Sequence, residues 1–263
     1  MQYEKIMSRT NDKIKEYIKI MNDSDFREEN KLFCIEGLRL CEDALKSDVY
    51  IKTVFFTEKI LLKYNNIILK LIEKSEKAVE ISEEIAKKIS DTKNNQGVFC
   101  VLTALDKKIT IDTIDRKGKY IALEDINDPA NLGTIIRTAE ALGLKGLILS
   151  ENCCDIYNPK VLRGSMGSVF RINFYKFVNF YKTIKELAGI IPVFGSVADN
   201  TAKKINEIDF DEGTVIIIGN EANGISKETK QICKDLITIP MKGDAESLNA
   251  SMAAGILIWE MMK

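Results

Sequence analysis

Histidine is absent from this chain of 263 residues, and its six cysteines include no Cys-x-x-Cys pair. Both absences argue against a zinc site, and the first removes the side chain that most often serves as general base near neutral pH. No apolar run approaches the roughly 20 residues of a membrane-spanning helix, and the amino terminus lacks the apolar segment of a signal peptide. We therefore expect a cytoplasmic protein with no metal ion and no membrane partner, whose thiols are buried or incidental.

The common phosphate-binding loops are missing as well. No Gly-x-x-x-x-Gly-Lys-Ser/Thr sequence occurs, and the apolar stretch 120–124 is followed by Asp-Ile-Asn-Asp-Pro instead of a glycine-rich turn. A P-loop and a dinucleotide-binding turn are therefore not supported. The formal net charge of −1 does not indicate nucleic-acid binding, so any RNA site has to be a local patch.

Short apolar stretches alternate with helical patterns along the whole chain, which is typical of an α/β protein. Residues 1–105 predict a small α/β domain, residues 106–119 mix charges around a single glycine and predict a linker, and residues 120–263 predict a second domain. The first domain is expected to hold helices at 14–21, 38–45, 60–73 and 83–89, strands at 32–35, 51–57, 78–81 and 98–105, and a polar turn at 23–30.

The second domain is expected to contain a mostly parallel sheet. Val215 to Ile218 is an unbroken run of β-branched residues, typical of a strand buried on both faces. Further strands are expected at 120–124, 146–150, 174–177, 192–197 and 236–239, and helices at 129–142, from Asn158 through Ser168, after Ser226 and from Ser247. Ligands of such sheets bind at the carboxyl ends of the strands.

Two groups of residues at these ends predict a binding site. The turn at Gly219, the strand end at 239–241 and the helix start at 247–249 place three backbone segments around one crevice. Asn131 and Arg137 lie on a face of helix 129–142 beside its apolar stripe, and we expect that face to be exposed.

These features, in this order, resemble the SpoU/TrmH family of RNA ribose 2′-O-methyltransferases. The resemblance rests on Asn131-Leu132-Gly133 to Arg137, Gly219-Asn220-Glu221 with Gly224-Ile225-Ser226, Ile237 to Met241 with Pro240, and Ser247-Leu248-Asn249. It implies that S-adenosylmethionine binds at Gly219, Glu221, Ile239, Met241, Leu248 and Asn249, and that Asn131 and Arg137 are catalytic. It also implies that the second domain is an α/β-knot, a trefoil-knotted and mostly parallel sheet.

The first domain carries looser motifs. Ser8-x-x-Asn11, Arg27, Phe33-x-x-Glu36-Gly37 and Gln96-Gly97-Val98 resemble the RNA substrate-binding domain that precedes the catalytic domain in many SpoU proteins. That domain looks like a small RNA-binding ribosomal protein. An equally simple interpretation is structural, with a glycine between strand and helix and a glutamine in a loop.

The resemblance implies methyl transfer to a ribose hydroxyl, most simply in ribosomal RNA because of the added amino-terminal domain. A guanidinium with a pKa above ~12 is a poor base, so we assign Arg137 the role of a charged donor and leave the proton acceptor open. Three alternatives also stay open: an RNA-binding or ribosome-assembly factor with an inactive methyltransferase domain, methylation of tRNA ribose, and methylation of a base or small molecule. The methylated nucleotide and the choice between a housekeeping and an antibiotic-resistance role stay open too.

The last helix predicts a second copy of the chain as a partner. Apolar residues occupy more than one of its faces: Leu248, Met252, Ile256 and Trp259, but also Leu257, Ile258 and Met261. One sheet covers only one face, so the surplus predicts a homodimer. The resemblance adds that the carboxy-terminal region packs against its twin and that Arg137 contributes to a shared site.

Overall fold

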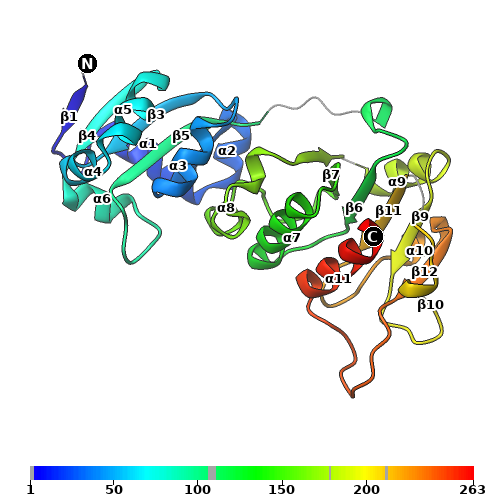
Figure 1. Cartoon of the computed structure of the whole chain (residues 1–263). Coiled ribbons are helices and arrows are strands. Elements are labelled where there is room, and N and C mark those ends of the chain that lie inside the picture. Colours follow the sequence, from blue (N-terminus) through cyan, green and yellow to red (C-terminus); the bar gives the residue numbers. More distant parts are fainter. Residues whose placement is uncertain (1–2, 106–110, 178, 211–212) are drawn as a thin grey trace. The chain divides into compact units, whose positions relative to one another are not determined.

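The structure, a computed structural model, describes residues 3–105, 111–177, 179–210 and 213–263. Backbone contacts divide the chain into two compact units, each of α/β type (Figure 1). The amino-terminal unit comprises Met1–Asp106 with Tyr157–Phe170, and the carboxy-terminal unit comprises Lys107–Ile156 with Arg171–Lys263. Residues 106–110 of the predicted linker lie outside the described residues.

The amino-terminal unit is built on a five-stranded sheet in the order β1-β4-β3-β5-β2. Strands β1, β4 and β3 are parallel, and β5 runs antiparallel to both β3 and β2. The strands are β1 (Glu4–Ile6), β2 (Leu32–Glu36), β3 (Ile51–Phe56), β4 (Lys77–Ile81) and β5 (Val98–Thr103). Four of them were predicted, whereas β1 was missed because three residues carry too short a pattern.

Helices cover both faces of this sheet: α1 (Asp12–Asn22), α2 (Ser24–Asn30), α3 (Leu38–Leu45), α4 (Glu58–Lys63), α5 (Asn65–Lys74), α6 (Glu83–Ile89) and α8 (Pro159–Ser165). Tyr17 of α1 lies at the centre of the core, edge-on to Phe55 and Phe99 with ring centroids 5.7 and 5.9 Å away. The ring of Phe33 in β2 stacks on the ring of Tyr157, with the ring centroids 4.3 Å apart.

Two predictions about where this unit forms helices were wrong. The polar segment 23–30 is not a turn but helix α2, because the Asp23 side chain caps it by accepting a hydrogen bond from the Phe26 amide at 3.0 Å. The single helix expected at 60–73 is two helices, α4 and α5, which are separated by a non-helical backbone at Tyr64.

The carboxy-terminal unit is built on a seven-stranded sheet in the order β10-β12-β9-β11-β6-β7-β8, and every described pairing in it is parallel. The strands are β6 (Lys119–Leu123), β7 (Gly146–Leu149), β8 (Asn173–Lys176), β9 (Val193–Ser196), β10 (Lys203–Lys204), β11 (Thr214–Ile218) and β12 (Asp235–Thr238). The prediction of a mostly parallel sheet is confirmed. All five residues of β11 are buried, as its β-branched run predicted.

Helices α7 (Pro129–Ala141) and α11 (Ala250–Met262) pack side by side, and α9 (Phe180–Ala188) packs on α10 (Lys227–Ile232) (Figure 1). Val215 and Ile217 of β11 join the apolar cluster that includes α9. Strand alternation directs Ile216 and Ile218 to the opposite face, where α11 contacts β11. The sheet is therefore covered on both sides, which leaves its strand ends as the open part.

Two predicted helix ends needed correction. Helix α11 begins after Asn249 and not at Ser247, because the Asn249 side chain accepts hydrogen bonds from the amides of Ser251 and Met252. Helix α8 ends at Ser165 and does not extend through Ser168, since Met166 adopts a left-handed conformation with φ of 51°.

Candidate active site

A cleft of about 960 Å³ opens at the carboxyl ends of strands β9, β11 and β12. All six residues predicted to bind the cofactor line it: Gly219, Glu221, Ile239, Met241, Leu248 and Asn249. One further wall was not predicted from the sequence: residues 196–200, the last residue of β9 and the segment after it. The rule that parallel strands present their carboxyl ends to ligands would have identified that segment once β9 was placed beside β11.

Gly219 is required by the chain's own turn. A Cβ atom on Gly219 would come within 2.1 Å of the carbonyl carbon of Gly224, because the chain folds back there with an Asn220–Gly224 bridge. A valine at this position would therefore act on the fold of the turn as well as on any bound ligand. The side chain would first displace the backbone of the turn that forms the cleft wall.

A second set of bonds ties this turn to strand β6. The Asn220 side chain accepts from the Ala222 amide at 2.9 Å, and its amide nitrogen donates to the Asp125 carbonyl at 2.9 Å. Asp125 holds a positive φ of 59°, and its carboxylate accepts a hydrogen bond from Ser150 Oγ at 2.6 Å. The backbone of a residue other than glycine is strained at a positive φ, so the surrounding contacts have to enforce this conformation at Asp125.

Asn131 connects the three motifs. Its Nδ2 donates to Glu221 Oε1 at 2.9 Å, and its Oδ1 accepts from Asn249 Nδ2 at 3.0 Å. We expected Asn131 on an exposed helix face, but it is only 6% exposed, so that expectation is wrong. Because its amide group is bonded at both atoms to protein partners, Asn131 fixes the side chains of Glu221 and Asn249, both of which line the cleft.

Arg137 is exposed on α7, as predicted. It lies six residues beyond Asn131, or about 9 Å along the helix axis at 1.5 Å per residue. It does not line the cleft, and among the described residues it makes no hydrogen bond or ion pair. Within a single chain, therefore, the structure brings together the six cofactor candidates and Asn131, but not Arg137.

An apolar stripe runs along the outer face of α11 and includes the residue just before its N-cap. We name it the α11 stripe: Leu248, Met252, Ile256 and Trp259, exposed by 38%, 61%, 37% and 58%. The inner face is the one that packs into the unit, with Ala254, Leu257, Ile258 and Met261 fully buried. The α11 stripe begins at the cleft, because Leu248 is also a lining residue.

The looser motifs of the amino-terminal unit hold the fold together. Arg27 is buried and donates to the carbonyls of Ile20 and Met21 at 2.8 and 3.0 Å. Glu36 accepts from the Asp91 amide at 2.9 Å, and Gln96 Oε1 accepts from the Leu38 amide at 2.8 Å. These bonds favour the structural interpretation of Arg27, Glu36 and Gln96.

Among the described residues, no cysteine lines the cleft. All six cysteines are free, and the Sγ atoms of buried Cys41 and Cys100 lie 3.6 Å apart. Hydrogen bonding to Cys100 and burial raise the pKa of the Cys41 thiol well above its ordinary value, so it stays protonated. Among the described residues, no group of three or more Cys, Asp or Glu side chains is arranged to hold a metal ion, and no helix is long and apolar enough to span a membrane.

Comparison with known proteins identifies the family. Residues 118–259 match the model of the SpoU rRNA methylase family, and residues 11–100 match the MRM3-like substrate binding domain. The chain belongs to the SpoU rRNA methylase family. The prediction of an RNA ribose methyltransferase that uses S-adenosylmethionine is confirmed by this membership, and so is the substrate-binding domain at the amino terminus.

Two proteins similar to this SpoU protein match nearly its whole length, and a third matches about half of it. It is 31% identical over 259 residues to the 23S rRNA (guanosine(2553)-2′-O)-methyltransferase RlmP of Bacillus subtilis, covering 98% of this chain and 99% of that protein. An rRNA methyltransferase from Sinorhizobium meliloti, solved with AdoMet bound, superposes with a TM-score of 0.85 at 29% identity, covering 99% of this chain and 98% of that one. A Streptomyces viridochromogenes 23S rRNA (uridine(2479)-2′-O)-methyltransferase is 34% identical over 140 residues, 51% of this chain and 49% of that protein.

Proposed function

We propose that this protein methylates a ribose 2′-hydroxyl of the 23S ribosomal RNA. The observation that carries the proposal is the cleft at β9, β11 and β12, which gathers every residue that the SpoU-type motifs assign to the cofactor. The name of the full-length relative RlmP supports the choice of 23S RNA over tRNA. Relatives named for a guanosine and for a uridine leave the methylated nucleotide open.

The cleft fits S-adenosylmethionine in size and chemistry. Its volume of about 960 Å³ lies at the upper end of the roughly 300–1,000 Å³ of small-molecule sites. Main-chain groups of the turns after β11 and β12 provide donors and acceptors, and Ile218, Ile225 and Leu236 provide apolar walls. When bound there, S-adenosylmethionine supplies a methyl group already activated for attack by an oxygen nucleophile.

The protein's own groups then align the acceptor and stabilise charge. Asn131 acts as a positioning residue, because its two hydrogen bonds hold Glu221 and Asn249 at the cleft. Arg137 binds a phosphate of the RNA and stabilises the oxygen that loses its proton, since a forked and permanently charged donor suits both tasks. Orientation of this kind can supply roughly 7–11 kcal/mol of a reaction barrier.

A homodimer completes the site in this proposal. The α11 stripe is a continuous apolar surface that begins at the cleft, and Arg137 lies on α7, the helix packed against α11. A second copy seated on the stripe covers Met252 and Trp259, which alone are 61% and 58% exposed, and brings an Arg137 close to a cleft that lacks one. The trefoil knot, the cytoplasmic location and the domain division at residues 106–119 belong to the same proposal.

The test is methyl transfer from labelled S-adenosylmethionine to 23S rRNA transcribed in vitro, with tRNA as a parallel substrate. Resistance of a single phosphodiester bond to alkaline hydrolysis then locates a 2′-O-methyl group. We expect one resistant position in the 23S RNA and none in tRNA. A label found on a base, on tRNA alone, or on no RNA despite measurable cofactor binding would refute the proposal, and the last result would favour an assembly factor.

A further inference from the structure

Charged side chains are rare in the wall of the cleft. Among the described residues that line it, three carry a charge: Asp199, Glu221 and Lys230. Glu221 belongs to the network described above, because its Oε1 accepts a hydrogen bond from Asn131 at 2.9 Å. Asp199, in the segment after β9, and Lys230, in α10, have no bond to that network within the described structure. The assembly of the cleft therefore does not account for these two charges.

Lys230 is the only cation among the described residues that line the cleft. Its side chain is exposed, and it makes no hydrogen bond, ion pair or ring contact with another described residue. A lysine ammonium has three donors and no acceptor. Lys230 can therefore donate to an anionic group that enters the cleft.

The Asp199 carboxylate is held in place by its own loop. Its Oδ1 accepts from the Thr201 amide at 2.8 Å and from Thr201 Oγ1 at 2.7 Å. These bonds, together with the charge of Lys230, lower the pKa of the Asp199 carboxyl, so this group is ionised near neutral pH. Within the described structure its Oδ2 accepts no hydrogen bond, so it can accept from a cationic group of a ligand.

These two charges act on each other, yet no ion pair joins them in the described structure. Two unjoined charges of opposite sign on one wall are complementary to a zwitterion. The amino acid end of S-adenosylmethionine is such a group, because its α-carbon carries both an ammonium and a carboxylate. The ammonium requires an acceptor and the carboxylate requires a donor, and Asp199 and Lys230 supply one of each.

We propose that Asp199 and Lys230 bind the amino acid end of S-adenosylmethionine, Asp199 through the α-ammonium and Lys230 through the α-carboxylate. This inference rests on the proposed function, since it takes S-adenosylmethionine as the ligand of the cleft. The two side chains are thereby specificity-determining residues. They select an adenosine derivative that carries an amino acid over adenosine and adenine nucleotides, which have no ammonium to meet Asp199 and leave its charge without a partner.

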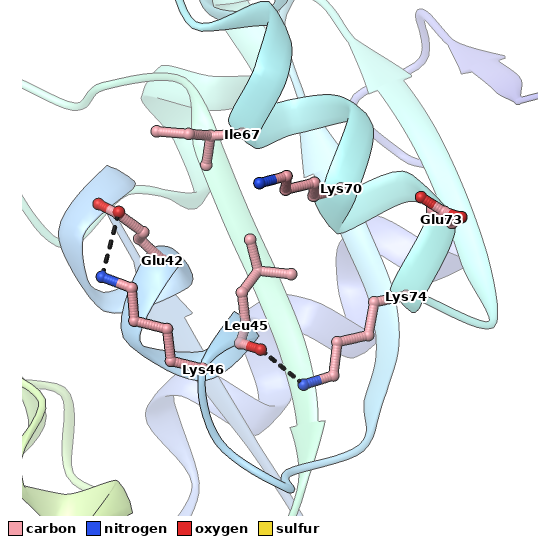
Figure 2. A pocket seen from close by; sticks show the side chains of 7 residues that line it. All are labelled: Glu42, Leu45, Lys46, Ile67, Lys70, Glu73 and Lys74. Atoms are coloured by element: carbon pink, nitrogen blue, oxygen red, sulfur yellow. Dashed lines mark hydrogen bonds and ion pairs between the residues drawn. The ribbon is translucent and has the colours of Figure 1, made fainter.

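A groove in the amino-terminal unit provides a control for Lys230. Helices α3 and α5 flank this groove of about 380 Å³, in which Lys74 donates to the Leu45 carbonyl at 2.9 Å (Figure 2). Figure 2 shows Lys70 over the groove with no bond drawn to it. Because Lys70, like Lys230, is an exposed lysine that lines a hollow and has no bond to another described residue, Lys70→Ala makes the same chemical change away from the cleft.

The experiment is calorimetric binding at low ionic strength in the absence of RNA. The ligands are S-adenosylmethionine, its decarboxylated analogue, which lacks the α-carboxylate, and its deaminated analogue, which lacks the α-ammonium. The proteins are the wild type, Asp199→Asn and Lys230→Ala. The controls are Lys70→Ala and Glu228→Gln, which removes an exposed carboxylate of α10 that does not line the cleft.

Each variant should lose its contact with one group of the amino acid alone. Lys230→Ala should bind S-adenosylmethionine about 10-fold more weakly, the effect of one hydrogen bond to a charged group, and should bind the decarboxylated analogue as the wild type does. Asp199→Asn should show the same pattern with the deaminated analogue. Both controls should bind all three ligands as the wild type does. Thermal unfolding should not change, because an asparagine still accepts from Thr201 and Lys230 bonds to no described residue.

The inference is overturned if either variant keeps wild-type affinity for S-adenosylmethionine, or loses as much affinity for the analogue that lacks the matching group. Equal losses in the controls would overturn it as well. Since the assay contains no RNA, it separates this inference from the proposed function. A protein that shows the pattern but methylates no RNA keeps the inference and refutes the proposed function, and methylation of 23S RNA without the pattern does the reverse. A wild type that does not bind S-adenosylmethionine refutes both.

Discussion

Replacing Asn131 with aspartate tests how the cleft is assembled. The aspartate has the shape of asparagine and keeps an oxygen that can accept from Asn249 Nδ2, now 3.0 Å from Asn131 Oδ1. It loses the donor that now reaches Glu221 Oε1 at 2.9 Å, and it sets a second carboxylate against the first. Asn131→Asp thus changes one contact of a residue that is 6% exposed.

The expected loss can be estimated from that contact. A hydrogen bond to a charged group contributes about 1.5–3 kcal/mol, and repulsion between the new buried carboxylate and the exposed carboxylate of Glu221 adds a smaller, solvent-screened loss. We therefore expect the free energy of unfolding of the carboxy-terminal unit to fall by roughly 2–4 kcal/mol. For a unit of this size, that corresponds to a drop in Tm of about 5–15 °C.

A swap of the two groups provides the decisive comparison. Glu221→Gln alone should have a small effect, because the Gln oxygen still accepts from Asn131. The double variant Asn131→Asp/Glu221→Gln restores a donor and a carboxylate acceptor in exchanged positions, so it should recover much of the stability lost by Asn131→Asp. The coupling free energy between the two sites should reach at least about 1.5 kcal/mol in favour of the double variant.

The assay is calorimetric unfolding of the four proteins, together with the Kd of S-adenosylmethionine for each. Affinity should follow stability across the series, because Glu221 lines the cleft. Additive losses in the double variant would refute the contact as the organising element. Wild-type affinity in Asn131→Asp would show that the network does not shape the cofactor site.

Three further predictions follow from the site. Arg137→Ala should lower the rate of single-turnover methyl transfer by ~10²-fold or more and leave the Kd of S-adenosylmethionine unchanged. Arg137→Lys should restore little of that rate because lysine lacks the forked guanidinium. Near-normal transfer by the alanine variant would exclude Arg137 from the mechanism. Gly219→Ala should destabilise the protein and weaken cofactor binding because its Cβ meets the backbone of Gly224, whereas Gly243→Ala, with no atom within 4 Å, should behave as wild type in both assays. Met252→Glu should halve the mass found by light scattering and abolish methyl transfer. Leu62→Glu, at an exposed apolar site in the other unit, should change neither. A dimeric Met252→Glu protein would argue against the α11 stripe as the interface.

Most elements of the fold could be predicted because strong local sequence patterns define them. The β-branched run of β11 and the Pro129 and Ser226 helix starts are decided by neighbouring residues, so the sequence alone located them. Helix α2 has a local cap at Asp23, but it is also held by buried Arg27, whose partners Ile20 and Met21 lie on the preceding helix. A polar composition concealed those tertiary contacts.

The site shows the same division. The motif spacing predicted which residues surround the cleft, because each motif follows a strand of one parallel sheet. It could not predict that Asn131 is buried between Glu221 and Asn249, since those residues come from turns about 90 and 118 positions further along the chain. Nor could it distinguish a glycine that admits a ligand from one that admits the returning chain, as at Gly219.

The strand order of the carboxy-terminal unit also governs how the protein is made. Strand β11 lies between β9 and β6, and β12 lies between β10 and β9, so the last two strands of this sheet along the chain are inserted into its interior. Until Thr214 has left the ribosome, β6 and β9 each present an unpaired edge and share no hydrogen bonds in the final register. Such edges invite pairing with other chains, and long-range parallel pairing is slow. This unit is therefore expected to fold only once β12 has been synthesised and to depend on chaperones more than the amino-terminal unit does.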